Sequence, residues 1–184
     1  SADEHRFMTE ERVMIREVAR AFTMDEVLPV ANELDPIQGE IPQALRNKLA
    51  EMGYFGIRLP EEYGGSGLGC FEYCLIAEQL ARGWMSVASL IARGNGTLMV
   101  DLLTEEQRQS LLPRIANGDY LAAMSLSEPD TGSDLASISC RAERDGDEWV
   151  TTGNKYWCTF ADGADYIVLL ARTAPSPDEK RRHL

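Results

Sequence analysis

The chain has 184 residues, enough for one ordinary domain or for one domain and part of another. It is 44% hydrophobic and 26% charged, which is too apolar for a disordered protein. Its net charge of −12 argues against nucleic acid as a partner, because phosphate backbones attract basic surfaces, and no apolar run approaches the roughly 20 residues that span a bilayer.

The cysteines and histidines of the chain limit which kinds of functional site it can form. The four cysteines show neither paired nor metal-like spacing: Cys70, Cys74, Cys140 and Cys158. The two histidines, His5 and His183, lie at the extreme ends of the chain. We therefore predict no metal site and no histidine-based triad, and we expect a reducing, cytoplasmic compartment.

The N-terminal part is predicted to form helices that prolines separate. The spacing of Val18 and Phe22 is typical of one apolar helix face, and Thr9 can cap this helix. Pro29 and residues 35–39 are expected to interrupt the pattern, because proline lacks the N–H that a helix interior needs.

Further helices are predicted as far as residue 118. They run from Pro42 to Gly53, over residues 70–81, over residues 85–103, and from Thr104 to about Gly118. Thr104 and Gln107 form a capping box, in which each side chain satisfies a backbone N–H at the start of the last helix. The segment 61–67 is a glycine-rich loop without a phosphate-binding pattern.

Beyond residue 120 the pattern becomes typical of strands. Strands are predicted over residues 121–127, 138–143, 149–152 and 166–171, and Asp145-Gly146 is a hairpin turn signal. The fold class is therefore α+β with segregated domains. We predict an all-α helical bundle over residues 1–120, followed by an antiparallel, β-barrel-like domain over residues 121–184. This β domain is expected to be incomplete, because its last strands would have open edges.

The loop over residues 125–134 is the first candidate for a functional site. It is rich in hydroxyl groups and contains Pro129 and Gly132, so it can present N–H and O–H donors to a flavin ring or a pyrophosphate. The same composition is also typical of an ordinary structural turn. Residues 130–133 match the D-T-G-S string of aspartic proteases, but the preceding 120 helical residues do not fit that all-β class.

The segment 155–159 is the second candidate. Trp157 can lie flat against an isoalloxazine ring, and Thr159 can form a hydrogen bond with an edge nitrogen of that ring. Composition alone favours the interpretation that Tyr156 and Trp157 pack on a β-sheet, and it leaves the flavin interpretation as the alternative.

Four motifs, in order along the chain, resemble the acyl-CoA dehydrogenase family. They are Gly53–Ile57 with Leu59–Gly65, Thr104–Gln107 with Leu112-Pro113, Ser127–Asp134, and Gly153–Thr159. The third is similar to the family's T-E-P-x-x-G-S-D string, with Ser127 where threonine is commoner. The fourth is similar to G-x-K-x-W-I-T, with Cys158 in place of an apolar residue.

The resemblance implies a helical domain, a central β domain and a C-terminal four-helix domain, with FAD between the last two. It also implies a homo-oligomer, a tetramer or a dimer. The implied FAD-binding residues are Met124, Leu126, Ser127, Gly132, Ser133, Trp157, Cys158 and Thr159. Among these, Ser127 would reach the pyrimidine edge, Ser133 the pyrophosphate or the acyl-CoA, Trp157 the ring face, and Thr159 the flavin N5.

The resemblance further implies an enzyme of fatty acid metabolism. It would dehydrogenate an acyl-CoA thioester between its α and β carbons and pass the electrons to an electron-transfer flavoprotein. The family's catalytic base is a glutamate of the C-terminal domain, so we expect no catalytic residue within the chain and no activity from the chain alone. The alternatives are a flavin oxidase or monooxygenase on the same scaffold, and a non-catalytic helical association module.

Overall fold

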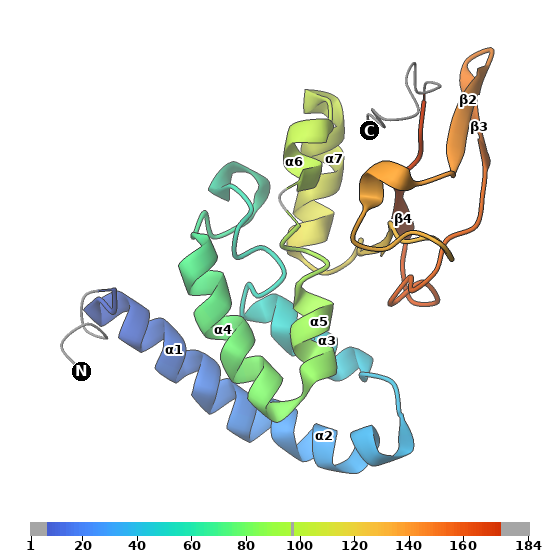
Figure 1. Cartoon of the computed structure of the whole chain (residues 1–184). Helices are drawn as coiled ribbons and strands as arrows, with labels where there is room; N and C mark the ends of the chain where they lie inside the picture. The colour runs from blue at the N-terminus through green and yellow to red at the C-terminus, as the bar shows by residue number, and fades with distance from the viewer. Residues whose placement is uncertain (1–6, 97, 174–184) are drawn as a thin grey trace. The chain divides into compact units, whose positions relative to one another are not determined.

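The computed structural model describes residues 7–96 and 98–173, so residues 174–184, the end of the predicted β domain, lie outside the described part. The chain divides into two compact units between Leu121 and Ala122. In the described residues the helices of the first unit precede the small sheets of the second, as the sequence predicts (Figure 1).

Seven α-helices are described in the first unit. They are α1 (Glu10–Phe22), α2 (Leu28–Leu34), α3 (Gln43–Glu51), α4 (Cys70–Gly83), α5 (Met85–Ile91), α6 (Leu98–Leu102) and α7 (Glu105–Ala116). A π-helical turn, Thr23–Val27, joins α1 to α2, and 3-10 turns cover Asp35–Ile37 and Glu61–Tyr63. The predicted caps are confirmed at two helix starts, where Thr9 accepts from Arg12 N and Thr104 accepts from Gln107 N.

The prediction that Pro29 interrupts the first helical pattern is wrong. The chain remains helical from α1 through the π-helical turn into α2, and Pro29 lies in the first turn of α2. A proline is tolerated there because the preceding turn is π-helical: Leu28 N bonds to Thr23 O, so the helical hydrogen-bond pattern is already shifted where Pro29 lacks its N–H. The pattern does end at Asp35–Ile37, as expected.

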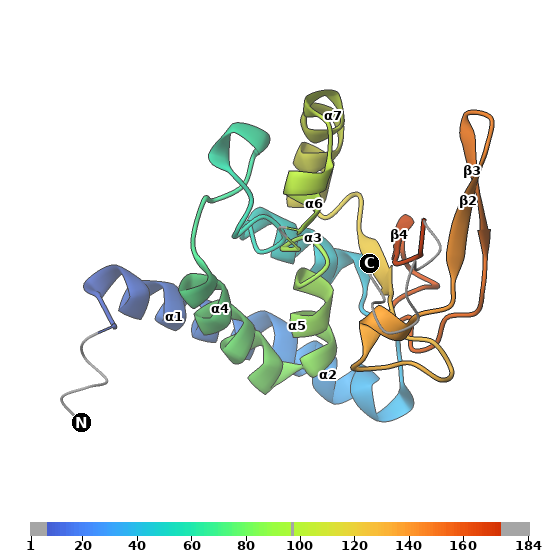
Figure 2. The ribbon, with the colours of Figure 1, turned by 45° about the horizontal axis from the view of Figure 1, so that its top comes forward.

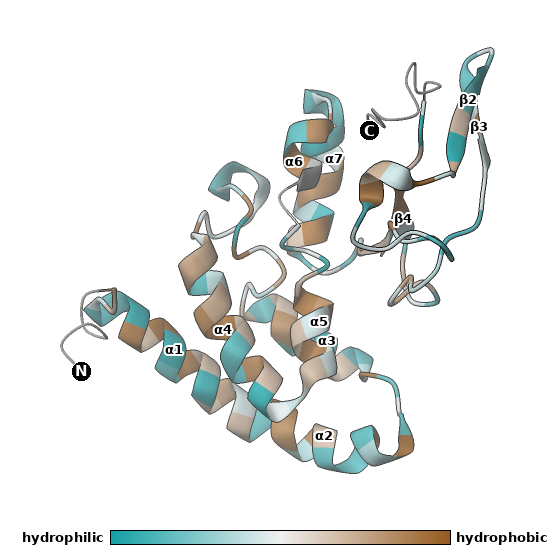
Figure 3. Ribbon diagram, viewed as in Figure 1, coloured by the Kyte–Doolittle hydropathy of each residue, from teal (hydrophilic) through white to brown (hydrophobic). Residues whose placement is uncertain are grey.

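The core of the first unit lies between α1, α4 and the shorter helices. Helices α1 and α4 run side by side in both views (Figures 1 and 2), and α5 is largely apolar along its length (Figure 3). Arg12 of α1 donates a hydrogen bond to Glu72 of α4 at 2.6 Å, which holds the pKa of the Glu72 carboxyl below its ordinary value. The buried side chains of this unit include Val27, Leu49, Phe55, Leu80, Ile91 and Leu112.

The single helix predicted over residues 85–103 is two helices, α5 and α6. The break contains Asn95, whose buried side-chain amide donates to Ile91 O at 2.8 Å and to Tyr54 O at 2.7 Å. Its side-chain oxygen accepts from Arg58 N at 3.0 Å. The Asn95 side chain thus takes over a carbonyl that a continued helix would have bonded, and so it terminates α5.

The second unit contains two small sheets. Strand β1 (Ala122–Ser125) pairs in parallel with β4 (Tyr166–Leu169), and β2 (Arg141–Asp145) pairs antiparallel with β3 (Glu148–Thr152). The predicted hairpin is confirmed, with Gly146 in the turn at φ 62°. Figure 2 shows β2 and β3 as a narrow ribbon.

The expectation of an antiparallel, barrel-like domain is only partly met. Strands β1 and β4 are parallel, and the strands of the described residues form two separate pairs rather than a closed barrel. The long connection between β1 and β4 permits the parallel pairing, because only a tight turn requires antiparallel neighbours. That connection contains a 3-10 turn (Leu135–Ser137) and the β2–β3 hairpin.

Candidate functional site

The loop after β1 begins with a closed turn between Glu128 and Thr131. Glu128 N donates to Thr131 O at 2.7 Å, and Thr131 N donates back to Glu128 O at 3.2 Å. Pro129 and Asp130 occupy the two central positions, which suits the fixed φ of proline. The turn interpretation of these residues is therefore confirmed for positions 128–131, and it leaves Gly132 and Ser133 exposed beyond it.

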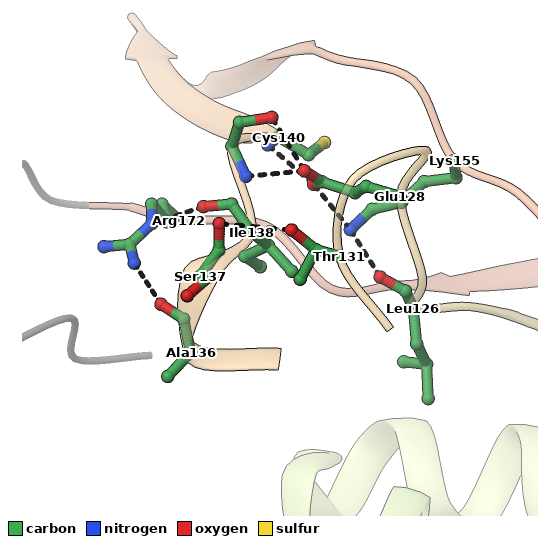
Figure 4. Close-up of polar contacts among 10 residues, drawn as sticks. Leu126, Glu128, Thr131, Ala136, Ser137, Ile138, Cys140, Lys155 and Arg172 are labelled. Carbon is green, nitrogen blue, oxygen red and sulfur yellow. Dashed lines mark hydrogen bonds and ion pairs between the residues drawn. The ribbon is translucent and has the colours of Figure 1, made fainter. Parts of the chain in front are cut away.

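The side chain of Glu128 points inward from this turn. It is 4% exposed and accepts hydrogen bonds from Ser139 N at 2.6 Å, Ser139 Oγ at 2.7 Å and Cys140 N at 2.8 Å. It also accepts from Lys155 Nζ at 3.0 Å (Figure 4). Burial raises the pKa of this carboxyl, but the bonds from Ser139, Cys140 and Lys155 outweigh burial and lower the pKa to about 2. Glu128 is therefore a carboxylate at neutral pH.

Lys155 connects this turn to the second candidate segment. Its side chain is 8% exposed, and the ammonium donates to Leu126 O at 2.8 Å as well as to Glu128. The next residue continues the connection, because Tyr156 N donates to Ser127 O at 2.9 Å. The structure thus brings residues 126–128 and 155–156 side by side.

A third segment is anchored to the same cluster. Arg172 donates from its guanidinium to the carbonyl oxygens of Ile138 and Ala136 (Figure 4), and its backbone pairs with Cys140 and Ala142. Because Cys140 also donates to Glu128, the residues around the 3-10 turn are fixed between Arg172 and Glu128.

The segment after Lys155 leaves its aromatic residues exposed. Trp157 is 85% exposed and Tyr156 is 54% exposed, and neither belongs to a strand. The expectation that these residues pack on a sheet is therefore wrong within the described residues. Trp157 has φ 61°, a left-handed conformation that bulky residues rarely adopt, and Thr159 N donates to Trp157 O at 2.9 Å. Such strained positions are concentrated at functional sites.

The other predicted site residues lie on the same two loops or on β1. Met124 of β1 is 39% exposed, Leu126, Ser127 and Cys158 are partly exposed, and Thr159 is exposed. Among the described residues, no hydrogen bond is found for the hydroxyls of Ser127, Ser133 and Thr159. A Cβ placed on Gly132 would meet no atom of the described residues within 4 Å, so there is open space beside it.

Sequence reasoning gave no role to Lys155, although it lies in one of the quoted motifs. Its partner Glu128 lies in another motif and is not among the residues that the resemblance assigns to FAD. The available signal was that the motif over residues 127–134 contains acidic residues and the motif over residues 153–159 contains one basic residue, Lys155. Spacing alone cannot pair them, because the chain offers 30 acidic residues and 18 basic ones.

Two features are absent from the described ranges, 7–96 and 98–173. No helix there is both long enough and apolar enough to cross a bilayer. No group of three or more histidine, cysteine, aspartate or glutamate residues there could bind a metal ion.

Known proteins are similar in sequence to this chain over both of its units. The chain is 41% identical over 168 residues to (2S)-methylsuccinyl-CoA dehydrogenase of Cereibacter sphaeroides, a match that covers 90% of this chain and 31% of that protein. It is 37% identical over 177 residues to benzylmalonyl-CoA dehydrogenase of Aromatoleum aromaticum, covering 95% of this chain and 46% of that protein.

A solved structure agrees with these sequence matches. The crystal structure of a glutaryl-CoA dehydrogenase from Mycobacterium smegmatis in complex with FADH2 superposes with a TM-score of 0.82 at 29% identity, covering 93% of this chain and 45% of that one. The chain thus spans between about a third and about a half of the length of these similar proteins.

Family profiles cover most of the chain. The profile of the acyl-CoA dehydrogenase N-terminal domain matches residues 9–119, and that of the acyl-CoA dehydrogenase middle domain matches residues 123–184. The first match alone covers more than half of the sequence. The chain therefore belongs to the acyl-CoA dehydrogenase family.

Proposed function

We propose that the chain is part of an FAD-dependent acyl-CoA dehydrogenase and supplies one wall of its flavin site. The observation that carries this proposal is the pairing of the two candidate loops, in which Tyr156 N bonds to Ser127 O and Lys155 bonds to Leu126 O. This pairing brings together, from separate parts of the chain, the two motifs that sequence reasoning assigned to the flavin.

The donors on these loops fit a flavin. A flavin ring offers carbonyl oxygens and ring nitrogens along one edge and a flat apolar face. The hydroxyls of Ser127 and Thr159 lack partners among the described residues and would bond to that edge. Trp157 is exposed and would cover the face, and Met124, Leu126 and Cys158 would contribute apolar contacts.

Gly132 and Ser133 would contact the phosphate end of the cofactor or the acyl-CoA. They follow the closed turn, are exposed, and leave open space where a phosphate or thioester group could approach the backbone. The Ser133 hydroxyl has no partner among the described residues and is therefore available to an anionic oxygen.

When bound, FAD would supply a two-electron acceptor for the dehydrogenation of an acyl-CoA between its α and β carbons. The residues of this chain would bind the ring, orient it and exclude water from one of its faces. Glu128 is already committed to four hydrogen bonds and keeps its pKa near 2, so it cannot serve as the base that removes a proton near neutral pH. We propose that this base lies outside the chain.

The proposal also covers the electron acceptor, the oligomeric state and the cellular compartment. We propose an electron-transfer flavoprotein as the acceptor of the electrons, a homo-oligomer, tetramer or dimer, and a role in fatty acid metabolism in the cytoplasm. The four cysteines are free thiols, which suits a reducing compartment.

The test uses the full-length protein that contains this chain, purified with added FAD. We expect a flavin spectrum that survives desalting and bleaches without oxygen when a thioester substrate is added. The panel contains methylsuccinyl-CoA, benzylmalonyl-CoA, glutaryl-CoA and straight-chain acyl-CoAs. Rapid reoxidation by O₂ in place of an electron-transfer flavoprotein would indicate an oxidase. A protein that stays colourless, or a yellow one that no thioester bleaches, would contradict the proposal.

A further inference from the structure

We propose that Lys155 is a positioning residue for the flavin. Its ammonium, paired with Glu128, fixes the first loop (residues 125–134) and the second loop (residues 155–159) in one relative arrangement. This inference rests on the proposed function for its effect on the cofactor. The effect on the two loops themselves concerns the chain alone and can be measured without any ligand.

The ion pair connects three segments at one point. The Lys155 ammonium donates to Leu126 O at 2.8 Å and to Glu128 Oε1 at 3.0 Å (Figure 4). The Glu128 carboxylate then accepts from Ser139 and Cys140 through three further bonds. Both charged side chains are more than nine-tenths buried, so water cannot substitute for either partner.

Hydrogen bonds from residues 155–156 occupy two backbone carbonyl oxygens of the first loop. Leu126 O accepts from Lys155, and Ser127 O accepts from Tyr156 N. The hydroxyl of Ser127 makes no hydrogen bond within the described part of the chain. Lys155 therefore holds the first loop through the backbone carbonyl of Leu126, and the Ser127 hydroxyl of the same loop remains available to donate a hydrogen bond to a ligand.

The chemistry of the pair favours positioning over stability. A buried ion pair gains little net stability over an apolar pair of similar volume, because both charges lose their hydration. Its geometry is strict, however, since Lys155 must keep two acceptors within hydrogen-bond distance. A pair of this kind fixes the register of two loops that apolar contact alone would leave free to slide. Trp157 and Thr159 lie two and four residues after Lys155 on the same loop, so their positions depend on it.

The experiment compares Lys155→Met with Arg141→Met in the full-length protein. Arg141 forms an exposed ion pair with Glu143 in the same unit, so its loss removes one positive charge without touching the two loops. We expect Lys155→Met to raise the FAD dissociation constant by about tenfold or more, as misplaced binding groups do. We also expect it to shift the visible bands of any flavin that is retained, whereas Arg141→Met leaves both properties unchanged.

A second measurement uses the same variants without FAD. Hydrogen exchange of the Tyr156 amide reports the bond to Ser127 O directly. We expect faster exchange in Lys155→Met than in the parent or in Arg141→Met. If the parent binds no FAD, the proposed function fails, and this exchange rate alone decides the role of Lys155.

The double variant Glu128→Gln/Lys155→Met covers the case in which the single variant does not fold, because it leaves no buried charge unpaired. It still removes the donor to Leu126 O, so we expect the same weaker FAD binding and faster exchange at Tyr156. The proposal is overturned if a folded variant lacking Lys155 matches Arg141→Met in FAD affinity, flavin spectrum and Tyr156 exchange. Lys155 would then only stabilise the fold.

Discussion

The side-chain amide of Asn95 donates a hydrogen bond to the backbone carbonyl of Tyr54 at 2.7 Å, joining the break between α5 and α6 to the segment after α3. The same side chain bonds to Ile91 O and Arg58 N, and Asn95 itself is buried. One polar side chain thus serves three backbone groups from two separate parts of the sequence, and it ends a helix that periodicity predicts to continue.

Replacing Asn95 by alanine should strongly destabilise the first unit. Three hydrogen bonds are lost, and the buried carbonyl of Tyr54 and the part-buried N–H of Arg58 lose their partners, so we expect a loss of about 3 kcal/mol in the free energy of unfolding. Urea unfolding followed by circular dichroism measures it. The control is Asn47→Ala, which removes an exposed amide whose side-chain oxygen accepts a hydrogen bond from Gln43, its one side-chain bond within the described residues. Equal midpoints for the two variants would show that the Asn95 bonds are unimportant.

A methyl group on Gly94 should be poorly tolerated, whereas one on Gly96 should be accepted. A Cβ on Gly94 would lie 2.2 Å from the backbone oxygen of Phe55, so the backbone must shift, while Gly96 has no atom within 4 Å of that position. We expect Gly94→Ala to lose about 2 kcal/mol or more and Gly96→Ala to change stability by less than about 0.5 kcal/mol. Thermal unfolding of both variants is the measurement. Similar melting temperatures would contradict the close approach of Gly94 to Phe55.

Acid should remove the stabilisation that Glu128 provides. Its pKa is lowered from 4.5 to about 2 in the folded chain, so the unfolded chain takes up the proton first as the pH falls. The stabilising effect is therefore complete above pH 4.5 and is lost as the pH falls through about 2. We expect Glu128→Gln to be less stable than the parent by about 3 kcal/mol at pH 7, because Lys155 then lacks its charged partner.

Urea unfolding of the parent and of Glu128→Gln, from pH 7 down to the lowest pH at which the parent stays folded, tests this dependence. The difference in stability should narrow below pH 4.5. Glu143→Gln is the matched control, since it removes an exposed carboxylate with the same charge. If the difference in stability between the parent and Glu128→Gln stays constant over the acid range, Glu128 is not held as a carboxylate by its hydrogen bonds.

Truncating Trp157 or Thr159 should affect the cofactor more than the fold. Both side chains are exposed, so Trp157→Ala and Thr159→Ala should change the stability of the protein without FAD by less than about 0.5 kcal/mol. In the full-length protein we expect FAD binding to weaken by about 1 kcal/mol for Thr159→Ala and by somewhat more for Trp157→Ala. Titration of the proteins with FAD provides the comparison. Unchanged affinity in both variants would place the flavin elsewhere.

The 184-residue chain alone should neither retain FAD on desalting nor reduce it with any acyl-CoA. The loops carry their cofactor-facing residues exposed, and a flavin bound to one wall keeps its other face in water, where stacking and hydrogen bonds lose most of their advantage. The visible spectrum after desalting, before and after addition of acyl-CoA thioesters, is the measurement. A yellow fraction that bleaches with a thioester would show that the chain carries a complete site.

The sequence by itself determined the order of helices and strands, two helix caps, the hairpin turn and the two motifs that form the candidate site. Each of these depends on residues close together in the chain, through periodicity, capping chemistry or turn preference. The family resemblance rests on the same kind of local pattern, which the profile matches over residues 9–119 and 123–184 support.

Only the tertiary structure decided the parallel pairing of β1 with β4, the break at Asn95, and the choice of Glu128 as the partner of Lys155. Each joins residues that are distant in sequence, and each was selected among many chemically equivalent candidates by the packing of the whole unit. A lysine carries no local signal for which carboxylate or carbonyl it will meet. Burial makes that choice, because a charge removed from water is stable only where the fold places the complementary groups around it.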